Sequence, residues 1–102
     1  MIVWRRDLYL GEGARDQKWK IIHNVRKHKL QLGAYVIVLS VNGKDTFDLI
    51  PTYMLSENSY KGRDIEVLGI ALGKDEACEL ARQMIQDVFD RTGDVNIRGY
   101  FS

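Results

Sequence analysis

The sequence predicts an α+β domain, a two-layer sandwich in which two helices cover one face of a mixed sheet of about five strands. The predicted order of elements is β-α-β-β-β-α-β. Three observations support this fold class. Short segments rich in β-branched residues alternate with two amphipathic segments, turn residues separate them, and no repeat or linker divides the chain. At 102 residues, the chain fits one domain over residues 1–102, which can bury a core unaided.

The first part of the chain contains three predicted elements. Ile2–Leu10 ends in alternating polar and apolar residues, as a half-buried strand does. The segment Ala14–Lys29 is predicted to be a helix, because one stripe at 3.6 residues per turn collects Trp19, Ile21, Ile22 and Val25. Tyr35–Val41 is apolar at consecutive positions, which is typical of a central strand covered on both faces or nearly so.

The middle of the chain predicts a hairpin. Asn42-Gly43 favours a tight turn, since both residues tolerate positive φ. The returning strand is Thr46–Ile50, and Pro51 ends it because proline cannot donate to the ladder. One helical turn is expected over Pro51–Leu55.

The last part of the chain predicts a strand, a helix and a final strand. Asp64–Ala71 is the next strand. Gly73 is expected to cap a second helix, and Gly93 to end it in the left-handed conformation. Val95–Phe101 is predicted to be the fifth strand.

With both helices on one face, the other sheet face is predicted to be open. Its candidate residues are Trp4, Tyr9, Val36 and Val38. An open apolar face on a small domain commonly forms an interface, so we expect a homodimer or a complex with a protein partner.

Charge and hydropathy exclude several classes of protein. The net charge of +1 excludes strong general attraction to nucleic acid, although residues 1–33 carry eight Lys/Arg against three Asp/Glu. No apolar run is long enough to span a membrane. Arginines follow the apolar residues at the N-terminus, the reverse of a signal peptide, which predicts a cytoplasmic protein.

Two surfaces are candidates for binding. The predicted first helix presents a polar face opposite its apolar stripe, formed by Lys20, His23, Asn24 and Lys27. A basic helix can contact nucleic-acid phosphates, although an ordinary solvated face explains the same residues. Tyr53 and Tyr60 bracket the least regular segment, and tyrosine is favoured at interfaces. We therefore predict a contact surface over residues 53–61.

Other chemical motifs favour structural interpretations. The glycine loops at residues 11–13 and 69–73 match neither a dinucleotide fingerprint nor a P-loop, so we expect turn geometry there. His23 and His28 project about 140° apart on a helix and cannot chelate one ion. Cys78 is predicted to be a small buried hydrophobe, and Asp48 to be an edge-strand charge. No metal or cofactor is expected.

The runs KWKIIHNVRKHKLQLGAYVIVLSVNGKDTFDLIPTYML and IEVLGIALGKDEACELARQMIQDVFDRTGDVNIRGYF resemble a family of small uncharacterised proteins from Clostridia-type Gram-positive bacteria. The resemblance spans nearly the whole chain. It implies a single-domain, bacterial, cytoplasmic protein and brings no catalytic residues.

The function that fits these observations is a non-enzymatic protein-interaction module. The alternative is an accessory protein that contacts nucleic acid through the basic first helix. A third interpretation is a small-ligand enzyme whose pocket lies in loops beyond the strand ends.

Overall fold

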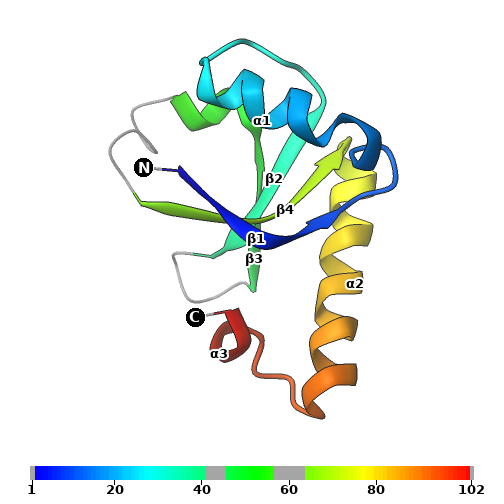
Figure 1. Ribbon diagram of the computed structural model, residues 1–102. Helices are drawn as coiled ribbons and strands as arrows, with labels where there is room; N and C mark the ends of the chain where they lie inside the picture. Colours follow the sequence, from blue (N-terminus) through cyan, green and yellow to red (C-terminus); the bar gives the residue numbers. More distant parts are fainter. Residues whose placement is uncertain (1, 41–45, 57–63, 102) are drawn as a thin grey trace.

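A computed structural model describes residues 2–40, 46–56 and 64–101. Figure 1 shows a mixed sheet with helices packed around it. The strands are β1 (Ile2–Leu10), β2 (Ala34–Leu39), β3 (Phe47–Pro51) and β4 (Ile65–Leu72). The α-helices are α1 (Lys18–Arg26), α2 (Lys74–Thr92) and α3 (Ile97–Phe101), and the 3-10 helices are η1 (Arg15–Gln17) and η2 (Thr52–Ser56). The α+β class is therefore confirmed, and the turn predicted after Pro51 is η2.

The strand order in the sheet is β1-β4-β2-β3, with β4 and β2 at its centre. β2 pairs with β3 in antiparallel register, as the hairpin prediction requires, although the predicted turn at Asn42-Gly43 lies outside the described residues. β4 is parallel to β1 and antiparallel to β2. β1 and β2 are thus neither neighbours nor parallel, so α1 does not close the β-α-β unit that the element order suggested.

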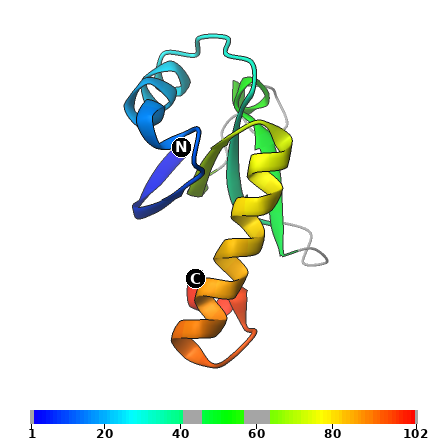
Figure 2. The same ribbon diagram turned by 90° about the vertical axis from the view of Figure 1, so that its right-hand side faces the viewer.

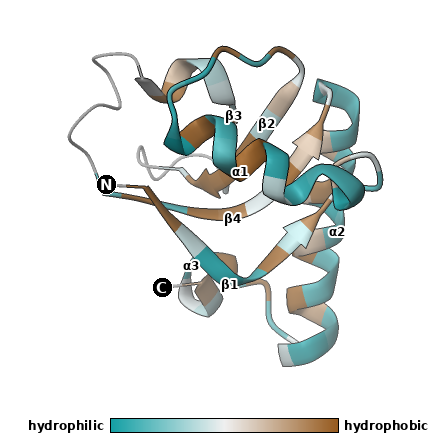
Figure 3. Cartoon of the chain, turned by 45° about the horizontal axis from the view of Figure 1, so that its top comes forward, coloured by the Kyte–Doolittle hydropathy of each residue, from teal (hydrophilic) through white to brown (hydrophobic). Residues whose placement is uncertain are grey.

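The two main helices lie on opposite faces of the sheet, so the prediction of both helices on one face is wrong. One core cluster joins Ile21, Ile22 and Val25 of α1 to Val36 and Val38 of β2. The other joins α2 and α3 to the opposite face of the strands, including Ile37. Figure 2 shows α1 and α2 on either side of the sheet, and Figure 3 shows hydrophilic and hydrophobic residues interspersed along both helices.

The four residues predicted to line an open face of the sheet do not lie together on one exposed face. Val36 is 0% exposed and Val38 is 6% exposed, because α1 covers them. Trp4 packs against this same cluster, whereas Tyr9 packs against the cluster on the α2 side. The sheet-face argument for a homodimer therefore fails, because each helix covers one face.

The C-terminal segment is the helix α3, not the predicted fifth strand. The side chain of Asn96 accepts a hydrogen bond from the Gly99 N–H at 3.1 Å, which caps the start of the helix. Ile97 and Phe101 are four residues apart and are both buried against α2 and the sheet. One helical turn thus places both apolar side chains on the core.

The sequence predicts the end of α2 correctly, but it does not predict the length of α1. Gly93 ends α2 at φ 70°, and its N–H donates to the Phe89 carbonyl, so the predicted left-handed stop is confirmed. α1 is shorter than the predicted Ala14–Lys29 helix. Trp19 is 70% exposed, so it is not part of the predicted apolar stripe.

The carboxylate of Glu76 joins the two glycine loops. One oxygen accepts from the Gly13 N–H at 2.7 Å and the other from the Leu72 N–H at 2.6 Å. Gly11 and Gly13 approach this carboxylate so closely that an added Cβ would lie 2.3 Å and 2.8 Å from its oxygens, respectively. The loop after β1 and the start of α2 are thereby held together by one side chain.

Candidate functional site

The end of α1 carries an unusual residue in a common helix-ending motif. His28 has φ 55°, and it is the only non-glycine residue with positive φ in the described ranges. The His28 N–H donates to the Val25 carbonyl at 3.1 Å, and the Lys29 N–H donates to the Asn24 carbonyl at 2.9 Å. These two bonds define a Schellman motif, in which glycine normally occupies the position of His28. A residue that keeps a strained conformation here suggests a constraint beyond folding.

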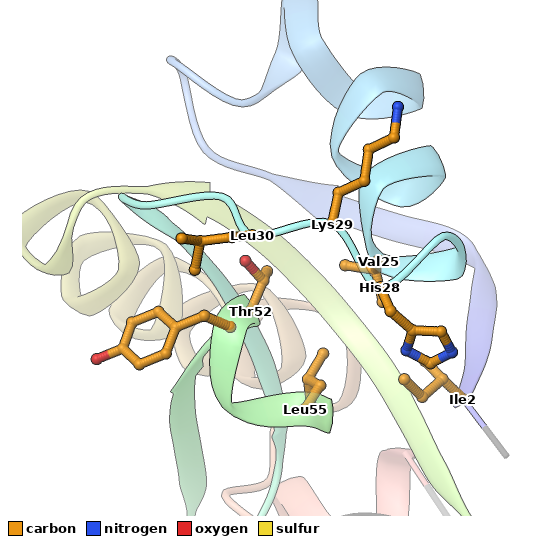
Figure 4. Close-up of a pocket in the computed structure, with 8 residues that line it drawn as sticks. Ile2, Val25, His28, Lys29, Leu30, Thr52 and Leu55 are labelled. Atoms are coloured by element: carbon orange, nitrogen blue, oxygen red, sulfur yellow. The ribbon is translucent and has the colours of Figure 1, made fainter. Parts of the chain in front are cut away.

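A pocket of about 120 Å³ lies between this helix end and η2. Its walls are Ile2, Val25, His28, Lys29, Leu30, Thr52, Tyr53 and Leu55. Figure 4 shows the imidazole of His28 beside Ile2, with Leu30 on the side of Thr52. The pocket thus joins three segments that are distant in the sequence.

The hydroxyl of Thr52 is a buried polar group at this pocket. Thr52 is 6% exposed, and its Oγ1 has no hydrogen-bond partner among the described residues. In Figure 4 this oxygen points towards the segment of Lys29 and Leu30. Most buried polar atoms in proteins are hydrogen-bonded. An unsatisfied hydroxyl beside a pocket is therefore a group that a polar partner bound there would stabilise.

Two exposed apolar side chains, Leu30 and Tyr53, line the pocket, and a third, Leu32, lies two residues beyond Leu30 on the same loop. Leu30 and Leu32 are 76% and 78% exposed, and Tyr53 is 43% exposed. We call these three residues the apolar rim. The chain from residue 18 to residue 33 also carries five Lys/Arg and no Asp or Glu. The site therefore combines a partly apolar pocket, which Lys29 lines, with a helix and loop that carry only positive charges, which we call the basic border.

The residues predicted to form the basic face of the first helix have different environments in the structure. Lys20, His23 and Lys27 are exposed on α1 or at its end, but none of them lines the pocket. Asn24 has a structural role, because its side-chain amide donates to Gln31 Oε1 at 3.2 Å. Gln31 in turn donates to the Ile21 carbonyl at 3.2 Å, which ties the loop to the helix.

Of the two predicted tyrosines, Tyr53 lines the pocket. Tyr60 lies outside the described residues. The other lining residues His28, Lys29, Leu30 and Thr52 were not predicted as site residues from the sequence. Leu30 and Leu32 did carry a signal, because two leucines between a helix and a strand have no periodic element to bury them.

The structure also bears on the predictions for Cys78, Asp48, the glycine loops and metal binding. Cys78 is exposed, so its predicted burial is wrong. Asp48 lies on β3, an edge strand, as predicted. The Glu76 carboxylate occupies the N–H of Gly13, which a phosphate bound at that loop would need. Among the described residues, no three His, Cys, Asp or Glu side chains gather as a metal site.

No helix within residues 2–40, 46–56 and 64–101 has both the length and the hydropathy to cross a membrane. Comparison of the chain with models of protein families, with curated proteins and with solved structures finds no match.

Proposed function

We propose that this protein is an interaction module that binds an acidic segment of a partner protein at the end of α1. An apolar side chain of that segment enters the pocket, and its acidic residues face the basic border. The observation that carries this proposal is the buried Thr52 hydroxyl, which has no hydrogen-bond partner in the described part of the chain, at a largely apolar pocket. A cytoplasmic location belongs to the same proposal.

The composition of the rim supports a peptide as the occupant. Leu30 and Tyr53 expose apolar surface at the pocket and Leu32 exposes more on the same loop, and exposed apolar surface commonly marks an interaction site. A backbone N–H of the bound segment can donate to Thr52 Oγ1, and this bond compensates for the desolvation of the hydroxyl.

The charge of residues 18–33 favours an acidic partner. Five Lys/Arg and no Asp or Glu lie in residues 18–33, and Lys29 lines the pocket itself. Complementary charge increases the association rate and discriminates against partners of the same sign. Flanking glutamates or aspartates are therefore expected in the bound segment.

Fluorescently labelled synthetic peptides provide the test. One peptide places a single leucine between glutamates, a second replaces the glutamates by lysines, and a third replaces the leucine by serine. We expect the first to bind at least about fivefold more tightly than the other two, a difference of about 1 kcal/mol. Equal binding of the three peptides, or no binding of the first, would refute the proposal.

Matched variants locate the binding surface. Lys29→Glu and Leu30→Ser are expected to weaken binding of the first peptide. Lys74→Glu makes the same charge change at an exposed position of α2, and Val95→Ser removes an apolar side chain that is 72% exposed elsewhere. These two controls are expected to bind normally. Equal losses in the controls would place binding away from the pocket.

A second copy of the chain is another possible occupant. Light scattering coupled to size-exclusion chromatography distinguishes this case, because our proposal predicts a monomer whose mass is independent of concentration. A homodimer that is disrupted by Leu30→Ser would assign the pocket to self-association.

A nucleic-acid function is the second candidate. Lys20, His23 and Lys27 are exposed, and Trp19 is 70% exposed with Lys18 Nζ 4.6 Å from its ring centroid. An exposed aromatic ring on a basic helix can stack on a base. Titration with single-stranded DNA or RNA at several salt concentrations tests this candidate. Binding that weakens with salt and is lost in Trp19→Ala would support it, and absence of binding at low salt would exclude it.

A further inference from the structure

A second pocket lies on the other side of the sheet, and its polar groups have a different character. Its volume is about 350 Å³, which is in the range of small-molecule sites. The lining residues come from β1, the end of α2 and α3: Arg5, Asp7, Leu8, Tyr9, Asp87, Arg91, Tyr100 and Phe101.

An irregularity of β1 places charged side chains at this pocket. The parallel register runs from Trp4 opposite Val67 to Tyr9 opposite Gly69. Residues 5–8 of β1 therefore stand against one residue of β4, Leu68. Bulges of this kind bend an edge strand and redirect its side chains, and they are frequent beside binding sites.

One of the two carboxylates of the pocket, that of Asp87, is already hydrogen-bonded. Tyr9 Oη donates to Asp87 Oδ2, and Arg91 Nε lies 3.1 Å from both oxygens of the same carboxylate. This hydrogen bond from Tyr9, followed by those from Arg91, lowers the pKa of Asp87. Asp87 is thus ionised and is hydrogen-bonded to both Tyr9 and Arg91.

The hydrogen-bond donors of the pocket are largely unused. Within the described ranges, Arg91 donates only through Nε, which leaves the terminal nitrogens of its guanidinium group. The side chain of Arg5 is 28% exposed, and its closest acidic partner, Glu66, lies 3.8 Å away. Its guanidinium carbon is 5.1 Å from the Phe101 ring centroid, and the Tyr100 ring lies 5.0 Å from that of Phe101.

We propose that this pocket binds a small organic oxyanion, a carboxylate or a phosphate ester. The oxyanion lies between the guanidinium groups of Arg5 and Arg91, and the apolar part of the ligand packs on Tyr100, whose half-buried ring lies against that of Phe101. Arginine favours such ligands, because its planar donors match two oxygens of a carboxylate or phosphate. Asp7 is exposed and also lines the pocket, and its negative charge disfavours an anion that lies close to it.

Titration followed by NMR amide and Arg Nε–H shifts tests this site. The probes are benzoate, phenyl phosphate and benzylamine, which share one ring and differ in charge. Saturable shifts at Arg91 and Phe101 are expected for at least one anion with Kd in the millimolar range, and none for benzylamine. The preferred anion identifies the carboxylate or the phosphate class.

Two variants complete the test. Arg91→Gln is expected to weaken anion binding at least about fivefold. Arg82→Gln is the matched control, because Arg82 also pairs with an acidic side chain on α2 and its side chain is 65% exposed, against 63% for Arg91. Absence of saturable shifts with both anions, equal binding of benzylamine, or an equal loss in Arg82→Gln would overturn the proposal.

Discussion

Replacement of Glu76 tests how the loop after β1 and the start of α2 are held together. Its carboxylate accepts two backbone hydrogen bonds, from Gly13 and from Leu72, at 2.7 and 2.6 Å. Hydrogen bonds to charged groups stabilise by about 1.5–3 kcal/mol each when buried. Glu76 is half-buried, so water replaces part of each bond in the variant. Glu76→Ala should therefore lower the free energy of unfolding by about 2–3 kcal/mol.

Asp75→Ala is the matched control for this prediction. Asp75 lies in the same first turn of α2 but is exposed, so its loss removes only the favourable interaction with the helix dipole. That contribution is about 0.3–1 kcal/mol. Urea denaturation followed by circular dichroism measures both variants. If Glu76→Ala costs no more than Asp75→Ala, the carboxylate does not bridge the two loops.

Three further predictions concern the cluster of Tyr9, Asp87 and Phe101. Phe101→Ala should cost about 3 kcal/mol in urea denaturation, since the ring is 3% exposed and contacts two other aromatic rings besides Tyr9; a cost below about 1 kcal/mol would contradict its place in the core. The lowered pKa of Asp87 means that its contribution to stability is present above the ordinary Asp pKa and is lost as pH falls through the folded-state value. The stability difference between the wild type and Asp87→Asn should therefore shrink below about pH 4, and a constant difference would refute this linkage. Burial and the bond to Asp87 raise the pKa of Tyr9, so alkaline titration by phenolate absorbance should show one late tyrosine that is missing in Tyr9→Phe; unchanged titration of the late group would exclude Tyr9.

The local elements were predictable because their signals are local. Apolar alternation and turn residues located β1, β2 and β4 to within one or two residues at each end. Gly93 requires no tertiary information, since its positive φ follows from the position after an amphipathic helix. The final segment was misread because Val95 and Ile97 alternate as in a strand. The capping side chain of Asn96 favours a helix instead.

The arrangement of the layers was derived wrongly from a correct observation. β2 is apolar on both faces, and this indicates that both faces are covered. A sheet with both helices on one face cannot satisfy that pattern, whereas helices on opposite faces do. The strand order was not predictable in the same way. The parallel pairing of β1 with β4 is a long-range contact with no signal in the sequence between them.

The candidate pocket was predicted only in part, because its walls come from separate segments. Tyr53 and the basic character of residues 18–33 were visible in the sequence. The buried Thr52 hydroxyl and the positive φ of His28 exist only in the folded chain. The predicted basic face lies along the middle of α1, whereas the pocket lies at the end of that helix.

His28→Gly is the most direct test of the proposed binding site, because it separates stability from binding. Glycine relieves the left-handed strain, worth about 1–2 kcal/mol, at an entropic cost of about 0.5–1 kcal/mol. The variant should therefore be as stable as the wild type or more stable by about 0.5–1 kcal/mol. It also removes one wall of the pocket. We predict at least about fivefold weaker binding of the glutamate-flanked leucine peptide by a fully folded protein. Unchanged binding in a folded His28→Gly protein would contradict the assignment of this pocket as the interaction site.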